Sequence, residues 1–227
     1  QYNMGFYRGP NIVTDGLVFA LDAASARSYP GSGTTATDLA GSSTISLDNG
    51  VGFSNTNGGT FVFDGTDDEI NTNLTTAYTD FSCVVIFKDN GSAAWGRLVD
   101  KAYQYGFFIT AYFASNGAGY VGGGVIVPSS PHGQGLVYDR TKYNYFVMTR
   151  SGTTQSIYLN GSATTASFTG SSAAMDTTSM SIGSWSGSTA TQRYTGDISV
   201  VKVYNKALTA AEIDQDFNAY KNRFGIW

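Results

Sequence analysis

The sequence predicts an all-β protein, a sandwich of two antiparallel sheets with one short helix near its C-terminus. Short apolar and aromatic segments recur along the chain between clusters of Gly, Asn, Asp and Ser, which is typical of strands and turns. No interval between these segments contains the helices that parallel strands need for their crossover connections. The strands are therefore expected to pair antiparallel.

The elements are expected in the following order. Residues 1–14 show no strand or helix period and are predicted to be an N-terminal arm or linker, followed by one domain over residues 15–227. Hairpin turns are expected at 89–91 and at 160–161, because Asn and Gly tolerate positive φ. The expected strands cover residues 17–21, 59–63, 68–71, 81–88, 97–100, 106–112, 120–127, 144–150, 155–159, 180–182 and 198–204.

A helix is predicted near residues 209–220. Thr209 as N-cap and Glu212 three residues later match a capping box, in which each side chain bonds the backbone N–H of the other residue. Ile213, Phe217 and Tyr220 then recur at a helical spacing and form one apolar face. We expect this face to lie against the sandwich.

The composition excludes several kinds of partner. Lys and Arg number 13 against 17 Asp and Glu, which gives a net charge of −4. A chain so poor in basic residues lacks the positive surface that nucleic-acid binding requires. No apolar run approaches the roughly 18 residues of a membrane span, so no membrane insertion is expected. The single cysteine, Cys83, rules out an internal disulfide and a thiolate zinc site.

Four segments carry a resemblance to a known family. Residues 61–70 read FVFDGTDDEI and residues 80–87 read DFSCVVIF. Residues 145–161 contain YFVMTR and IYLNG, and residues 181–213 contain SIG, TGDI and VYNKALTAAEI. In this order they resemble the laminin-G-like branch of the concanavalin A-like lectin/glucanase superfamily. The resemblance covers residues 15–224 and implies a jelly-roll arrangement of the two sheets.

The opening of the domain resembles a subtype of that family. Residues 10–39 are similar to lectin-like domains of structural proteins in tailed bacteriophages, marine ones in particular. This resemblance implies a non-enzymatic subunit on the virion surface, as a capsid decoration, fibre or appendage, in contact with other virion subunits or with copies of itself. The alternative is a carbohydrate-binding lectin or adhesin module of a secreted, extracellular bacterial protein.

The resemblance also raises calcium as a cofactor. The family usually has an acidic residue after its G-x-I motif, where this chain has Ser199. Calcium takes six to eight oxygen ligands, and the carboxylates near the motifs are those of Asp22, Asp64, Asp67 and Asp197. Two interpretations stay open: these residues bind calcium, or they cap turns and the protein has no cofactor.

No catalytic residues are expected. Glycosidases need a pair of carboxyl groups beside the scissile bond, but the acidic strings lie at a turn (67–69) and on the expected helix (212–216). His132 is the single histidine and lies in a Gly- and Pro-rich segment that is expected to be a loop. Since a nucleophilic triad needs a histidine with positioned partners, nothing indicates one.

Sugar binding has more support. Binding pockets combine apolar or aromatic surfaces with a few well-placed polar groups. The same residue types also fill cores and subunit contacts, which is the alternative. If they bind sugar, the partner is a host-surface polysaccharide. The candidates in expected loops are Trp95, Tyr103, Tyr105, Asn116, His132, Trp185 and Tyr194.

The two ends of the chain are predicted to make assembly contacts. Each carries apolar side chains outside the expected strands, and a monomer rarely leaves such groups exposed together. The predicted contact residues are Tyr2, Phe6, Tyr7, Phe224, Ile226 and Trp227.

Overall fold

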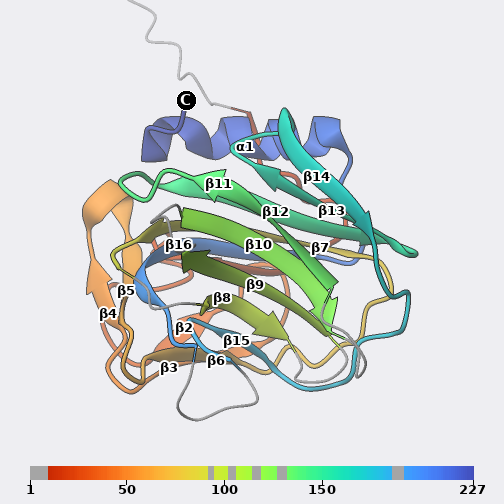
Figure 1. The fold of residues 1–227 in the computed structure, drawn as a ribbon. Helices are drawn as coiled ribbons and strands as arrows, with labels where there is room; N and C mark the ends of the chain where they lie inside the picture. The colour runs from red at the N-terminus through yellow and green to blue at the C-terminus, as the bar shows by residue number, and fades with distance from the viewer. Residues whose placement is uncertain (1–9, 92–94, 102–105, 114–118, 127–131, 186–191) are drawn as a thin grey trace, which may run out of the picture.

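A computed structural model of the protein describes residues 10–91, 95–101, 106–113, 119–126, 132–185 and 192–227. Two antiparallel sheets pack face to face, as the sequence predicts, and a helix lies over the outer face of one of them (Figure 1). We call the sheet beneath the helix sheet A and the opposite one sheet B. Within the described residues, each sheet contains eight strands.

Sheet A is organised around β16 (Thr195–Tyr204), whose two halves have different neighbours on one side. The first half pairs with β5 and the second with β1, and the register shifts between Ile198 and Val200. This β-bulge contains Ser199, the position at which the sequence departs from the family pattern. The order in sheet A is β14 (Thr164–Thr169), β13 (Thr154–Leu159), β12 (Asn144–Ser151), β7 (Phe81–Asp89), β16, β5 (Thr60–Asp64) and β4 (Gly52–Ser54), with β1 (Leu17–Asp22) beside β16.

Sheet B joins segments from both halves of the chain. Its short strand β15 inserts between β8 and β6, although more than a hundred residues separate β15 from β6. The order in sheet B is β11 (His132–Tyr138), β10 (Gly119–Ile126), β9 (Gly106–Phe113), β8 (Gly96–Lys101), β15 (Met180–Ile182), β6 (Glu69–Thr72), β3 (Thr44–Asp48) and β2 (Thr35–Thr37).

Several details differ from the sequence-based expectation. The strands β2, β3, β4, β11 and β14 were not predicted, and His132 lies at the start of β11 rather than in a loop. Residues 89–91 are not a hairpin turn, because β7 belongs to sheet A and β8 to sheet B. The turn at Asn160 and Gly161 is confirmed, with φ of 55° and 104° between β13 and β14.

Two apolar layers stabilise the fold. The main core lies between the sheets and is rich in phenylalanine, with the rings of Phe81 and Phe107 stacked at a centroid distance of 4.6 Å. The second core lies between the outer face of sheet A and α1 (Ala210–Phe224), where Tyr145 and Val200 face Ile213. One outer face of the sandwich is thereby covered.

The helix begins as the sequence predicts and ends later. The Thr209 side chain accepts a hydrogen bond from the Glu212 N–H, and the Glu212 carboxylate accepts one from the Thr209 N–H, so the capping box is confirmed. The helix continues to Phe224, where Gly225 adopts a left-handed conformation with φ of 63°. In the part of the chain that the structure describes, no helix has the length and apolar character that a membrane crossing needs.

Candidate functional site

The outer face of sheet B carries a row of side chains aligned across every described strand of that sheet. Along each strand the inward residues are apolar, for example Ile45, Ile70 and Ile109, and alternation places their neighbours outside. Residues that pair directly across the sheet therefore form one outward row. From β2 to β11 the row is Thr35, Ser46, Asn71, Ser181, Asp100, Phe108, Gly124 and Gly133. Within it Ser181 and Asp100 are buried, at 3% and 0% exposure, so the accessible polar side chains of the row are those of β2, β3 and β6.

Hydrogen bonds orient the polar groups of β3 and β6. Asp48 and Glu69 are opposite one another on these strands, two residues along from the row. The Asp48 carboxylate accepts hydrogen bonds from the Asn71 side-chain amide and, at 3.3 Å, from the Ser46 hydroxyl. These four side chains are half-buried, so each is fixed while part of it faces solvent.

Glu69 links this group to β15 and to the segment after it. Its carboxylate accepts a hydrogen bond from the Ser181 hydroxyl at 2.9 Å and one from Arg193 at 3.0 Å. Arg193 also donates to the Asp68 carbonyl oxygen at 3.4 Å. Both oxygens of Glu69 are therefore occupied by donors.

An arginine and an aromatic ring lie next along the row. The Arg97 guanidinium lies over the Phe108 ring, 4.3 Å from its centroid, and donates to the Gln192 side chain at 2.8 Å. Burial lowers the pKa of Arg97, and the Asp100 carboxylate 3.6 Å away opposes that shift. The ring of Phe108 is half-buried.

Beyond Phe108 the row contains no side chains. Gly122 lies opposite Thr110 and Gly135, and Gly124 lies opposite Phe108 and Gly133. Glycine within a strand often marks a place where a ligand or another backbone approaches closely. This face thus changes from hydrogen-bonding side chains on β3 and β6 to glycine backbone at Gly122, Gly124, Gly133 and Gly135, with Tyr120 and Val137 beyond them.

The loop residues predicted to bind sugar differ in their position and exposure. Trp95 is half-exposed, at 51%, and Trp185 is half-buried. Their segments run side by side, because the Gly183 N–H donates to the Leu98 carbonyl oxygen. These two tryptophans stay candidates at the rim of sheet B.

Of the other sugar-binding candidates, the structure describes the side chain of Tyr194 alone. Tyr194 is fully buried and donates to the Lys88 carbonyl oxygen at 2.8 Å, and burial raises its pKa well above the usual value. Its predicted sugar contact is therefore wrong. Tyr103, Tyr105, Asn116 and the side chain of His132 lie outside the described residues.

Of the four aspartates proposed for calcium, two lie together. Asp64 and Asp67 converge with Asp68 at the turn between β5 and β6, with carboxylate oxygens within 4.8 Å of one another. Asp22 instead forms an ion pair with Arg223 at 2.9 Å, and Asp197 accepts from Tyr143 at 3.0 Å. Asp22 and Asp197 are therefore not part of this cluster.

Two of the three clustered carboxylates accept hydrogen bonds within the turn. Asp64 accepts from the Thr66 N–H at 2.7 Å, and Asp68 accepts from the Asp64 N–H at 2.8 Å. Burial raises the pKa of Asp68, with the nearby charges of Asp64 and Asp67 adding to the shift. Oxygen ligands suit calcium, and three carboxylates, each bound through one or two oxygens, would supply three to six of the six to eight oxygens it takes.

The residues predicted to make assembly contacts also differ in their exposure. Phe224 and Ile226 are 7% and 4% exposed in the core beneath α1, so they are not free for contacts with another subunit. Trp227 is 86% exposed. Tyr2, Phe6 and Tyr7 lie outside the described residues.

Comparison with family models identifies the fold family. Residues 64–214, two thirds of the chain, match the model of the concanavalin A-like lectin/glucanases superfamily. The chain belongs to this superfamily. No curated protein sequence matches the chain.

Several solved structures have a fold similar to that of this chain over most of its length. The binding domain of botulinum neurotoxin DC in complex with SialylT has a TM-score of 0.68 and 14% identity, over 91% of this chain and 52% of that one. The heptameric SAP-like pentraxin from Limulus polyphemus has a TM-score of 0.56 and 17% identity, over 67% of this chain and 78% of that one. The chain spans about half the length of the toxin binding domain.

Sequence reasoning missed the row on sheet B. The signal available was alternation: Ser46 and Asp48 alternate with Ile45 and Leu47, which places them on an outward face. Which strands lie beside β3 is not visible in that alternation. The neighbours come from residues 69–72 and 180–182, far along the chain.

Proposed function

We propose that this domain binds carbohydrate on the outer face of sheet B. The observation that carries the proposal is the in-register row of polar side chains that ends at Phe108. Sugar hydroxyls both donate and accept hydrogen bonds, and Asp48, Asn71 and Ser46 offer fixed acceptors and donors side by side. The Arg97 guanidinium covers one face of the half-buried Phe108 ring, and the rest of the ring supplies an apolar surface for sugar C–H groups.

The comparisons support the proposal at the level of fold. One similar structure is described as a botulinum neurotoxin binding domain in complex with SialylT, and another as that of serotype D in complex with N-acetylneuraminic acid. The second has a TM-score of 0.68 at 13% identity, covering 90% of this chain and 51% of that one. A sialylated saccharide is therefore a sensible first ligand to test, together with bacterial surface polysaccharides.

The domain is proposed to act without catalysis. Glu69 and Asp48 are the paired carboxylates of the outer face, but donors from Ser181 and Arg193 occupy both oxygens of Glu69. A glycosidase of the retaining type needs one carboxylate free to attack the sugar. Release of reducing ends from laminarin, agarose or carrageenan, abolished by Glu69→Gln, would contradict this part of the proposal.

The proposed setting is the surface of a virion, with other virion subunits or copies of this chain as protein partners. The support is the resemblance of residues 10–39 to phage structural proteins. Display in many copies would turn weak single-site binding into useful avidity, because each further contact is then intramolecular. Copurification of the chain with particles is the test, and its absence would favour a secreted lectin or adhesin.

A glycan array followed by calorimetry tests the binding site. Asn71→Ala is expected to weaken binding several-fold, since a lost hydrogen bond contributes about 0.5–1.5 kcal/mol. Phe108→Ala is expected to weaken it because the apolar surface for sugar C–H groups is lost. Thr165→Ala is the matched control, because Thr165 is exposed on β14 at the edge of sheet A. Equal binding by all three variants, or no binding of any glycan, would overturn the proposal.

A further inference from the structure

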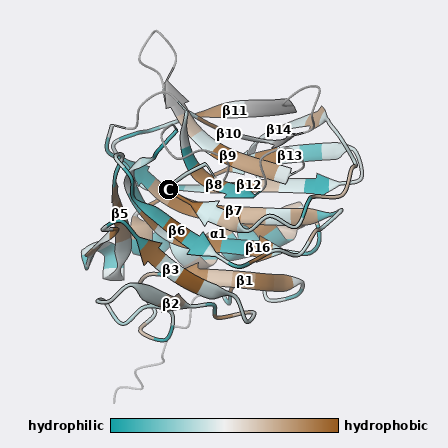
Figure 2. Ribbon diagram, turned by 90° about the horizontal axis from the view of Figure 1, so that it is seen from below, coloured by the Kyte–Doolittle hydropathy of each residue, from teal (hydrophilic) through white to brown (hydrophobic). Residues whose placement is uncertain are grey.

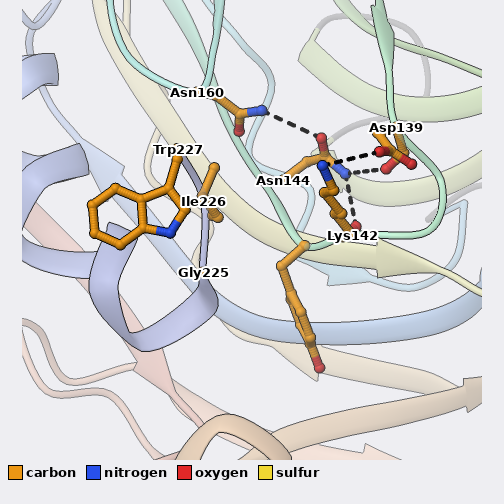
Figure 3. A pocket seen from close by; sticks show the side chains of 8 residues that line it. Asp139, Lys142, Asn144, Asn160, Gly225, Ile226 and Trp227 are labelled. Carbon is orange, nitrogen blue, oxygen red and sulfur yellow. Dashed lines mark hydrogen bonds and ion pairs between the residues drawn. The ribbon is translucent and has the colours of Figure 1, made fainter.

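A small pocket lies on the opposite side of the sandwich, beside the C-terminal end of α1 (Figure 3). Its volume is about 210 Å³, below the roughly 300–1,000 Å³ of pockets that take drug-sized ligands. Residues from three places line it: the segment before β12, the turn after β13 and the chain after α1. The side chains that matter here are Asp139, Lys142, Asn144, Asn160, Ile226 and Trp227.

Hydrogen bonds make the floor of this pocket rigid. The Asn144 side-chain amide donates to the carbonyl oxygens of Asp139 and Lys142, each at 2.9 Å. The Asn160 side-chain oxygen accepts from the Tyr145 N–H at 2.8 Å, and its amide donates to the Asn144 oxygen at 3.4 Å. Asn144 is 1% exposed, so these bonds hold two chain segments together under the pocket.

The end of α1 fixes the opposite wall. Gly225 in its left-handed conformation turns the chain, and the Ile226 N–H donates to the Lys221 carbonyl oxygen at 3.0 Å. Ile226 is buried at 4% exposure and anchors the turn. Trp227 follows directly, 86% exposed, with the Lys221 ammonium 5.6 Å from its ring centroid.

The groups that remain open to solvent have complementary chemistry. The Asp139 carboxylate accepts from the Thr141 N–H and hydroxyl, and these bonds lower the pKa of Asp139 and keep it ionised. The Lys142 ammonium lies 3.5 Å from the same carboxylate, and both side chains are largely exposed. An acceptor and a donor thus lie on one side of the pocket, and the Trp227 indole lies on the other (Figure 3).

We propose that this pocket is a second saccharide subsite, which takes one pyranose ring of a glycan. Adjacent ring hydroxyls can donate to Asp139 and accept from Lys142 on one side of the pocket, while the C–H groups of the ring face Ile226 and Trp227 on the other (Figure 3). The pocket holds a single ring rather than a chain. With sheet B facing the other way, the domain would contact glycan on two sides, and this subsite does not depend on the one proposed there.

The test is NMR of the full chain with the methyl glycosides of glucose, galactose, mannose and N-acetylglucosamine. The three tryptophans give three indole N–H signals, and Trp227→Phe assigns the one from Trp227. We expect at least one glycoside, at up to tens of millimolar, to shift this signal in the wild type and in Asn71→Ala. The shift should be lost in Asp139→Asn, which keeps the acceptor for Thr141 but removes the charge.

Asp176→Asn is the matched control, because Asp176 accepts from the Thr178 N–H at 2.8 Å as Asp139 does from Thr141. It should respond to the glycoside like the wild type. The proposal is overturned if no glycoside shifts the Trp227 signal, or if Asp139→Asn responds unchanged. It is equally overturned if the signal moves with protein concentration instead of sugar, since Trp227 would then contact a second copy of the chain.

Discussion

Lys202 and Asp216 form an ion pair that is almost fully buried between β16 and α1, at 1% and 0% exposure. Asp216 also accepts from the Tyr145 hydroxyl at 2.9 Å and from the Val13 N–H at 3.3 Å. Burial lowers the pKa of Lys202, and the charge of Asp216 opposes that shift. One residue of the helix therefore holds a strand, a neighbouring tyrosine and the N-terminal segment in place.

Asp216→Ala is expected to lower the free energy of unfolding by about 3–5 kcal/mol, because the buried Lys202 charge loses its partner. Asp15→Ala is the control: Asp15 pairs with Lys206 but is 82% exposed, and such a pair contributes about 1 kcal/mol or less. Urea denaturation measures both. Similar losses in the two variants would contradict the role assigned to the buried pair.

Asp68 gives a pH-dependent prediction at the same scale. Its pKa is raised from the usual 3.8 by burial, with the charges of Asp64 and Asp67 contributing. The pKa of Asp68 is higher in the folded protein than in the unfolded chain, so between these two pKa values the folded protein binds more protons. The contribution of Asp68 to the free energy of unfolding therefore falls as the pH rises through this window, and it stays lower above it. Asp68→Asn keeps an acceptor for the Asp64 N–H and has no charge to bury.

We therefore expect Asp68→Asn to gain stability relative to the wild type as pH rises from about 3 to 7. Urea denaturation at several pH values, with EDTA and with calcium chloride, measures the difference. A wild type that calcium stabilises at neutral pH, beside a variant that calcium leaves unchanged, would show that the cluster binds the ion after all.

At the scale of elements, β10 shows why a strand can be rich in glycine. Gly123 points into the core, and a Cβ at this position would lie 2.8 Å from the Met148 Sδ and 3.0 Å from the Phe108 carbonyl oxygen. Met148 belongs to β12 in sheet A, so glycine lets the two sheets approach closely at this point. Hydrophobic and hydrophilic residues follow one another along several strands, and hydrophilic residues stand out along β6 (Figure 2).

Gly123→Ala is expected to destabilise the protein by roughly 1–3 kcal/mol through overpacking. Met148→Ala tests the cause, because it removes the side chain that the new methyl group would meet. In the Gly123→Ala background, Met148→Ala should cost less than it does alone, and thermal or urea unfolding of the four proteins gives the coupling energy. Strict additivity would show that the strain arises elsewhere.

At the scale of the whole molecule, the two outer faces of the sandwich differ. Sheet A is covered by α1, and the ends of the described chain meet in that layer, where Val13 and Ile226 belong to the same core. Sheet B presents its polar row instead. Val13 and Ile226 are thus part of the core on one side, and the half-buried polar side chains of β3 and β6 lie on the other.

A chain that ends at Arg223 is therefore expected to lose several kcal/mol of stability, because Phe224 and Ile226 are buried and each large core side chain contributes roughly 2–5 kcal/mol. Trp227→Ala is the control and should change stability by about 0.5 kcal/mol at most, since its side chain is exposed. Urea denaturation compares them. If the shortened chain were as stable as the control, these residues would be free for assembly contacts, as their sequence position suggests.

The sequence by itself determined those features that depend on neighbouring residues. Thr209 and Glu212 lie three apart and predict the start of α1, and Asn160-Gly161 predicts the turn that follows β13. Alternating apolar residues predict most strands of the two sheets. Five short or polar strands escaped prediction, because a segment such as Thr164–Thr169 becomes a strand only by pairing with β13.

Only the tertiary structure decided which residues share a surface. Ser46, Asn71, Ser181 and Asp100 line up because β15 inserts between strands that come much earlier in the chain. In the same way, Phe224 is buried only because α1 folds onto sheet A. Strand pairing and burial of this kind are stabilised by residues that are distant in the sequence. Local sequence patterns therefore do not predict them.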